Sequence, residues 1–462
     1  MFLKTVIKIR NINQSNHSSG RLFLPIIFLL IISVKFLFAQ EGDSLVYHGN
    51  YSIKVDSINL SGNETTKDFI ILRELTFKVG DTVNHSILEY NRERIYSLDI
   101  FTKVELIPAI SHGRNIVYIK VEESWYIYPL PFVEIKERDW KKLSFGAYVI
   151  LKNFRGRNEL LEGRVSLGYD PAFSTSYYSP NFLRKEDISL LLDATFLKAK
   201  NKSEIAKYYY GSDFDQKFIS TGINLGKRIG FYNRFSLAIR YDYVETPLYI
   251  PGISASDSRI DRYPSLGLGY SYDTRDLAQF AKEGIFASTS YYLKGFGING
   301  INYQVFTMDF REYRHIAGGL TGKWRFTTRV TSGKRIPYYD YSFIGYNERI
   351  RGHFLTLYEG NNYYLSSLQF DYPILKDIDI NLNFIPIIPH ELLSYRFAIY
   401  AEIFGDAGAT KLRGRSFGIN DIQSGYGTGL AFLVLPYAII RLELAFDEYH
   451  KSQWILDFGS SF

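Results

Sequence analysis

The chain has 462 residues, with 54 Lys and Arg against 48 Asp and Glu, and a formal net charge of +6. Residues 1–39 hold five of the basic residues and no acidic one, so the other 423 residues carry +6 − 5 = +1, and the basic excess does not argue for nucleic-acid binding. The absence of Cys excludes disulfides and thiolate metal sites, and a mean hydropathy of −0.12 without a long uncharged apolar run argues against a helical membrane protein.

The first forty residues are typical of a targeting segment. Four basic residues precede an unbroken run of 13 apolar or small residues from Leu22 to Val34. Such a run is too short to span about 30 Å of hydrocarbon, but it suits the core of a signal peptide. We therefore predict a signal peptide at residues 1–39, with cleavage after Ala39, and a linker at 40–52; the alternative is an uncleaved membrane anchor.

A small α+β module is predicted at residues 53–123. The expected elements are a strand at 53–60, a short helix that begins with a capping box of Thr65 and Asp68, a second helix at 85–98, and strands at 103–109 and 115–122. This order and the phrases Leu-Ser-Gly-Asn at 60–63 and Leu-Asp-Ile-Phe at 98–101 resemble a POTRA (polypeptide-transport-associated) domain. The resemblance implies a periplasmic module that receives partner chains by strand addition, whereas an ordinary ligand-binding module is the alternative.

After a linker at 124–142, residues 143–462 read as antiparallel strands that alternate apolar and polar side chains. Alternation alone fits a soluble sandwich or a membrane barrel, but the strand length and the many Tyr and Phe near strand ends favour the barrel. We predict an all-β transmembrane barrel of 16 antiparallel strands. The segments are 143–154, 159–170, 174–183, 187–198, 203–212, 217–229, 232–245, 263–273, 284–295, 302–315, 320–332, 361–373, 395–408, 425–435, 438–446 and 452–462.

Three phrases resemble motifs of the outer-membrane insertase superfamily of BamA/TamA-like, bacterial surface antigen type. They lie at residues 345–354, 403–408 and 425–446, in the order of that family. The resemblance implies that Arg351 of a long loop pairs with Asp406 in the barrel lumen, and that Gly352 allows a tight turn beside the wall. A second family acid falls where this chain has Gln369, and Asp371 is the expected substitute.

The C-terminal segment predicts an assembly signal. Trp454, Leu456, Phe458 and Phe462 are expected on one face, and a terminal aromatic after alternating apolar residues is similar to the signal of bacterial outer-membrane barrels. No nucleophile elbow, zinc-protease pair or phosphate-binding loop with its Lys occurs, and the Gly-rich phrase at 295–300 lies between strands. We therefore expect no enzyme, no cofactor and no metal site.

The resemblance implies an ATP-independent insertion or translocation factor in the bacterial outer membrane, with its N-terminal module in the periplasm. The implied partners are unfolded outer-membrane or secreted polypeptides, outer-membrane lipid, and periplasmic chaperones or accessory lipoproteins, and no nucleic acid. This topology puts residues 245–262, 333–360 and 409–424 outside the cell, and the receiving seam where 143–154 meets 452–462. The alternatives are a two-partner-type secretion pore for a soluble passenger and a passive porin or structural protein.

Overall fold

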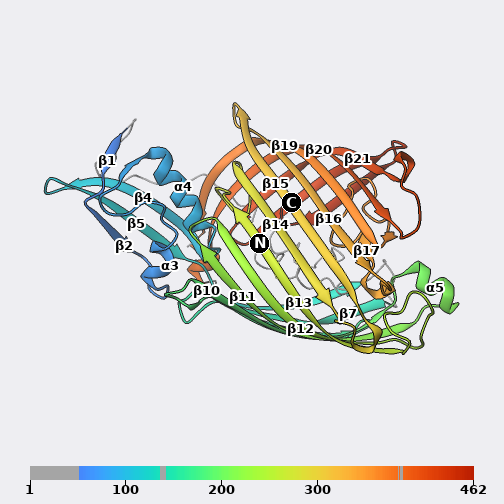
Figure 1. Cartoon of the computed structure of the whole chain (residues 1–462). Helices are drawn as coiled ribbons and strands as arrows, with labels where there is room; N and C mark the ends of the chain where they lie inside the picture. The colour runs from blue at the N-terminus through green and yellow to red at the C-terminus, as the bar shows by residue number, and fades with distance from the viewer. Residues whose placement is uncertain (1–50, 136–141, 383, 386–388) are drawn as a thin grey trace.

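A computed structural model describes residues 51–135, 142–382, 384–385 and 389–462 (Figure 1). The predicted signal peptide and nearly all of the linker at 40–52 lie outside the described residues. The chain forms a small N-terminal module at one end of a large curved sheet. None of the helices in the described ranges is long and apolar enough to cross a membrane.

The N-terminal module (residues 52–123) contains two small sheets and two helices. β1 (Ser52–Lys54) pairs with β3 (Thr82–Asn84), while β5 (Arg114–Glu123) lies between β2 (Ser57–Ser61) and β4 (Phe101–Ser111). The strand expected at 53–60 is therefore two strands. The helices are α3 (Asp68–Leu72) and α4 (His85–Tyr96), and Asn84 caps α4 by accepting a hydrogen bond from the amide of Ile87 at 2.9 Å.

The expected capping box on the first helix does not form. Lys67 precedes α3 and provides no side-chain cap. Instead, the carboxylate of Glu123 accepts hydrogen bonds from the backbone amides of Thr65 (3.1 Å) and Thr66 (2.6 Å). A carboxylate far along the chain thus satisfies the amide of Thr65, which the side chain of Asp68 was expected to satisfy, and also that of Thr66.

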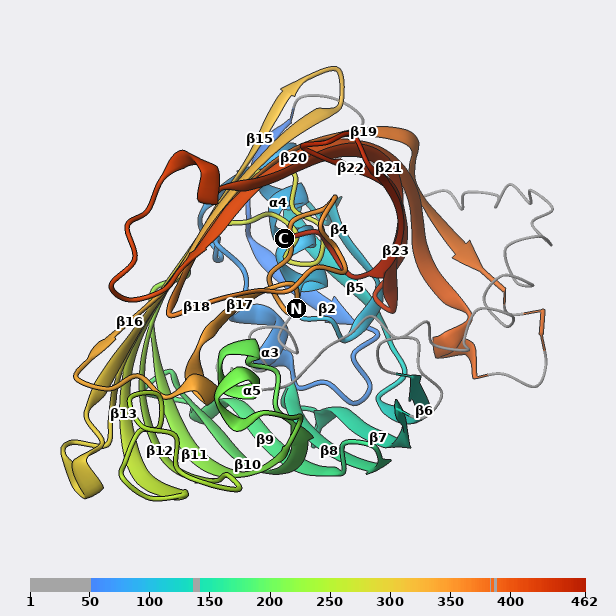
Figure 2. The same ribbon diagram turned by 90° about the vertical axis from the view of Figure 1, so that its right-hand side faces the viewer.

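Sixteen strands form one antiparallel sheet, which confirms the predicted fold class (Figures 1 and 2). In sheet order they are β6 (Ile127–Ile135), β7 (Leu143–Phe154), β8 (Glu159–Gly168), β9 (Ala172–Leu183), β10 (Ile188–Lys200), β11 (Asp215–Ile229), β12 (Asn233–Glu245), β13 (Ile260–Asp273), β14 (Gly284–Lys294), β15 (Tyr303–Ala317), β16 (Leu320–Gly333), β19 (Asn362–Asn381), β20 (Ser394–Lys411), β21 (Gln423–Leu435), β22 (Ala438–Asp447) and β23 (Ser452–Phe458). The loop between β16 and β19 adds a hairpin of β17 (Ser342–Ile344) and β18 (Tyr358–Gly360).

The strand count agrees with the prediction, but two of its members differ. Residues 203–212 were expected to form a strand and instead contain helix α5 (Glu204–Tyr210), which Ser203 caps at its start and left-handed Gly211 ends. The predicted linker at 124–142 contains β6, which pairs with β7. The seam therefore lies between β6 and β23, not between residues 143–154 and 452–462, and no ladder joins these two edges within the described ranges.

The polarity of the sheet decides between sandwich and membrane barrel. In β12, Leu237 and Ile239 point outward and Ile239 is 59% exposed. Their neighbours Arg240 and Asp242 are buried on the inner face, with Asp242 only 1% exposed. A soluble sandwich would bury the apolar face, whereas a membrane barrel turns it toward lipid and encloses the charged face. The wall is therefore that of a membrane barrel.

Candidate functional site

The loop from β16 to β19 enters the barrel instead of standing above it. Figure 2 shows β17 and β18 crossing the interior of the ring of strands. Gly352 lies in this loop with φ +103°, and a Cβ atom there would come within 2.5 Å of the backbone oxygen of Phe446. On the facing strand, a Cβ at Gly425 would lie 1.6 Å from the backbone oxygen of Arg351. Two glycines therefore let the loop backbone lie directly against β21 and β22.

Arg351 is the centre of a buried polar cluster in the lumen. Its Nε and Nη2 each donate to one carboxylate oxygen of Asp406 at 2.8 Å, and its backbone amide donates to Asp406 Oδ2 at 2.9 Å. The guanidinium carbon also lies 3.6 Å from the ring centroid of Phe404. The side chain of Arg351 is 7% exposed and that of Asp406 is 1% exposed, so this pair is protected from water on both sides. Two parallel hydrogen bonds and a ring contact fix the position of the loop in a way that a Lys could not reproduce.

The remaining donor of Arg351 connects the loop to two further strands. Its Nη1 donates to Gln369 Oε1 at 2.8 Å and to Glu443 Oε1 at 3.2 Å. Asp371, the expected substitute acid, does not contact Arg351; it pairs with Lys323 at 2.5 Å and accepts from Gln369 at 2.7 Å. The second acidic partner of Arg351 is therefore Glu443 of β22.

Glu443 continues the cluster to the last strand of the sheet. Its Oε1 accepts from Arg441 Nη1 at 2.6 Å, and Arg441 Nη2 donates to Asp457 of β23 at 2.6 Å. Arg441 Nε also donates to the backbone oxygen of Gly459 at 2.9 Å. Alternating charges thus link the lumen loop to the strand that forms one side of the seam.

Two acidic residues hold the same loop on the adjoining part of the wall, and the sequence analysis missed both. Asp340 accepts from Lys294 at 2.7 Å and from Tyr303 at 2.9 Å, and it pairs with Arg329. Glu348 accepts two hydrogen bonds from Arg325 at 2.6 and 2.9 Å. The loop therefore places acids against the basic wall of β14–β16 and a guanidinium against the acidic wall of β19–β22.

The C-terminal residues do not share one face. Trp454 is 73% exposed and Leu456 40% exposed on β23, which ends at Phe458. Phe462 is instead buried, and its backbone oxygen accepts a hydrogen bond from the hydroxyl of Tyr313 at 3.3 Å. The expectation that Phe462 lies on the face of Trp454 is wrong, because the chain turns at Gly459, with φ +93°, after the strand ends. The role of these residues as an assembly signal stays a prediction.

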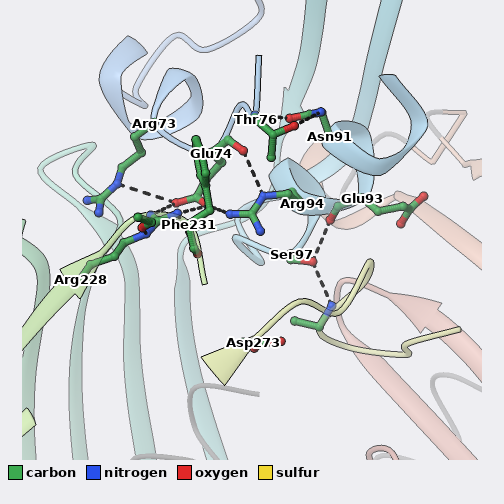
Figure 3. A network of polar contacts seen from close by, with 12 residues as sticks. Arg73, Glu74, Thr76, Asn91, Glu93, Arg94, Ser97, Arg228, Phe231 and Asp273 are labelled. Carbon is green, nitrogen blue, oxygen red and sulfur yellow. Dashed lines mark hydrogen bonds and ion pairs between the residues drawn. The ribbon is translucent and has the colours of Figure 1, made fainter. Parts of the chain in front are cut away.

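A second polar network joins the N-terminal module to the barrel (Figure 3). Glu74 accepts from Arg228 of β11 at 2.6 and 3.1 Å and from Arg94 of α4 at 2.7 Å. Burial opposes the ionisation of Glu74, but these guanidinium groups outweigh it and lower the pKa of Glu74 below its ordinary value. Glu93 of α4 binds Arg396 of β20 at 2.9 and 3.1 Å.

Apolar packing and a backbone contact complete this junction. Leu277 and Phe280, from the turn between β13 and β14, are each 3% exposed and join the hydrophobic core of the module. In the same turn, the amide of Ala278 donates to Ser97 Oγ at 2.9 Å. The module is therefore packed against the barrel and is not merely tethered to it.

Two family models match the chain. An Omp85 superfamily domain matches residues 153–462, and a POTRA model described as a surface antigen variable number repeat matches residues 53–124. The first match alone covers more than half of the chain. The chain belongs to the Omp85 superfamily. With the outward apolar face of the sheet, this membership assigns the barrel to the outer membrane.

Individual relatives of this Omp85 chain are distant. The outer membrane protein assembly factor BamA of Neorickettsia risticii (strain Illinois) is 26% identical over 181 residues, which cover 36% of this chain and 23% of that protein. The crystal structure of BamA from Haemophilus ducreyi lacking POTRA domains 1–3 has 17% sequence identity and a TM-score of 0.51, over 88% of this chain and 84% of that one. CdiB from Acinetobacter baumannii has 14% identity and a TM-score of 0.48, over 88% and 73% of the two chains. At these identities the structural likeness concerns the fold alone.

Proposed function

We propose that this Omp85 protein inserts or translocates polypeptides at the outer membrane without ATP, in the manner of BamA/TamA-type factors. The observation that carries the proposal is the pair of free strand edges at β6 and β23, which belong to one sheet and have no ladder between them in the described ranges. A free edge offers unpaired backbone donors and acceptors to an incoming strand. A client strand then pairs first with an edge of the N-terminal module and next with the seam.

Both seam strands are suited to opening. β6 contains Pro129 and Pro131, which cannot donate backbone hydrogen bonds, and β23 has only seven residues. The edge of β6 can therefore form an incomplete ladder at most. Weak pairing at one line of an otherwise continuous wall lowers the cost of exchanging a barrel strand for a client strand.

A site-specific photo-crosslinking experiment tests the seam. A photoreactive residue replaces Val133 of β6 or Leu456 of β23, which are 48% and 40% exposed, and the matched control replaces Ile239 of β12, which is 59% exposed. We expect crosslinks to newly exported polypeptides from the two seam positions and not from Ile239. Equal crosslinking from all three positions would show that lipid exposure alone controls contact. Depletion followed by outer-membrane and secretome proteomics then identifies the clients and separates an insertase from a secretion pore.

The proposed orientation places the N-terminal module in the periplasm and the loops at the other end of the barrel outside the cell. The chain has no Cys, so single cysteines report position without background. On intact cells, an impermeant maleimide is expected to label Asn420→Cys in the β20–β21 loop and not Lys120→Cys in the module; both native side chains are exposed. Labelling of Lys120→Cys alone would reverse the orientation.

A further inference from the structure

The loop between β20 and β21 (residues 412–422, the rim loop) bends outward over the barrel wall, at the end away from the N-terminal module (Figure 2). The backbone amide of Arg413 donates to Asn361 Oδ1 at 2.7 Å, and its guanidinium donates to the backbone oxygens of Gly333 and Lys334. The ring of Phe417 lies 6.4 Å from the ring of Tyr364, on β19. Tyr364 alternates with the buried residues Tyr363 and Leu365, so it belongs to the outward face of the strand. The rim loop therefore lies against the lipid-facing side of the wall.

Apolar side chains of the rim loop extend the lipid-facing surface. Ile419 is 82% exposed, Phe417 45% and Ile422 41%. Isolated exposed apolar residues need no explanation, but these three fall within six residues, and Phe417 lies against the outward-facing Tyr364 of the wall. The exposed apolar side chains of the rim loop therefore begin where the outward face of β19 ends.

Basic side chains gather at the same place. Lys334, Lys411, Arg413 and Arg415 lie in or beside the rim loop, and no ion pair involves any of them within the described ranges. The acid of the loop, Asp421, accepts a hydrogen bond from the amide of Gly418 at 2.7 Å. Beside Lys334, Arg335 and Asp257 pair with each other, so five cations against two acids leave an excess of three positive charges next to the exposed apolar residues.

We propose that the rim loop is a binding site for anionic, phosphorylated lipid of the outer leaflet. Lys411 and Arg415, with Lys334, contact the phosphate groups, while Phe417 and Ile419 enter the upper acyl region. Arg413 positions the loop through the backbone oxygens that it already holds. Apolar burial combined with cations at headgroup level is the arrangement by which interfacial segments bind charged membranes. This inference depends on the outward orientation of the loop proposed above.

The test places an environment-sensitive fluorophore on Ile419→Cys in the full-length, Cys-free protein. The protein is reconstituted into phosphatidylcholine nanodiscs that contain diphosphoryl lipid A, dephosphorylated lipid A or neither. We expect a blue shift of the fluorophore that is largest with diphosphoryl lipid A. Lys411→Glu with Arg415→Glu is expected to lower the affinity for diphosphoryl lipid A, read from the dependence of this shift on lipid content, by about fivefold or more for each cation replaced. The control, Lys54→Glu with Lys185→Glu, makes the same charge change near the opposite end of the barrel and leaves the response unchanged.

Each other outcome would overturn the proposal. An equal blue shift in all three nanodiscs means apolar insertion without phosphate recognition. No shift in any nanodisc means that the loop does not meet the bilayer, and a response abolished equally by free inorganic phosphate means a site for soluble anions. A heat-dependent gel shift verifies that every variant is folded, and polypeptide insertion into phosphatidylcholine vesicles is measured separately. If the protein with all four native cations does not recognise phosphorylated lipid but still inserts polypeptides, this inference is refuted and the proposed function stands.

Discussion

Removing the guanidinium of Arg351 is expected to release the lumen loop. Its replacement by Ala leaves the carboxylate of Asp406, 1% exposed, without its two side-chain hydrogen bonds at 2.8 Å, and it also removes the contact with Glu443. Breaking a buried ion pair by removing one partner costs about 3–5 kcal/mol. Asp406→Ala is expected to cost less than Arg351→Ala, because Gln369 and Glu443 still accept from the guanidinium.

Limited proteolysis of residues 333–360 in the purified, folded barrel measures this cost. When loop opening is fast relative to cleavage, the cleavage rate follows the population of the open form, so Arg351→Ala is expected to raise it about a hundredfold or more. Arg351→Lys keeps the positive charge but loses the two parallel hydrogen bonds to Asp406, and we expect this variant to be cleaved faster than the native protein. The double variant is expected to be no worse than Arg351→Ala, since the interaction is already lost.

An exposed ion pair supplies the matched control. Arg259 and Glu245 approach to 3.0 Å, but their side chains are 53% and 21% exposed. Arg259→Ala is therefore expected to change stability by less than about 1 kcal/mol. The reasoning fails if Arg351→Lys matches the native protein, if the costs of the two Ala variants simply add, or if Arg259→Ala has an effect as large as Arg351→Ala.

Three further predictions concern the other polar contacts. Because the folded pKa of Glu74 is lowered, Glu74 stabilises the module–barrel junction above its unfolded pKa of about 4.3, and this stabilisation is lost as the pH falls through the folded pKa. Hydrogen exchange of α4 is expected to show this loss in the native protein and not in Glu74→Gln. Identical pH profiles for the two proteins would exclude the effect. Asp340→Asn is expected to increase cleavage of the lumen loop by weakening its attachment to Lys294 and Arg329, whereas Asp257→Asn, in an exposed pair with Arg335, is expected to have little effect on the same digest. Arg441→Ala is expected to accelerate hydrogen exchange in β23 more than in β12, and equal rates in native and variant β23 would contradict the link through Asp457.

The strand pattern and the loop anchor were accessible from the sequence for different reasons. Alternation of side chains identified the wall strands because the two faces of the sheet meet different environments. Alternation could not say which face meets lipid, and the exposed Ile239 beside the buried Asp242 supplied that information. Pairing of Arg351 with Asp406 was implied by a family resemblance, since no local pattern connects residues 55 positions apart.

The errors arose where local and tertiary signals differ. Residues 203–212 were expected to form a strand, but Ser203 and Gly211 provide the capping residues at the start and end of a helix. The predicted linker at 124–142 contains β6, whose two prolines are tolerated because β6 lies at the edge of the sheet. Asp340 and Glu348 had no sequence signal, because their partners are on strands that only the folded sheet brings near.

The position of the lumen loop gives it a direct physical connection to the proposed seam. From Asp406 the contacts run through Arg351, Glu443 and Arg441 to Asp457 on β23, with separations of 2.8, 3.2, 2.6 and 2.6 Å. Each inner member of this series has an opposite charge on both sides, so displacing one group removes one of the two ion pairs of each inner neighbour inside the buried cluster. A client strand that displaces β23 must therefore break the pair with Asp457 or move the loop as well. The lumen loop and β23 are thus connected by one series of ion pairs. The free energy of opening the seam therefore includes the free energy of breaking or rearranging these ion pairs in the lumen.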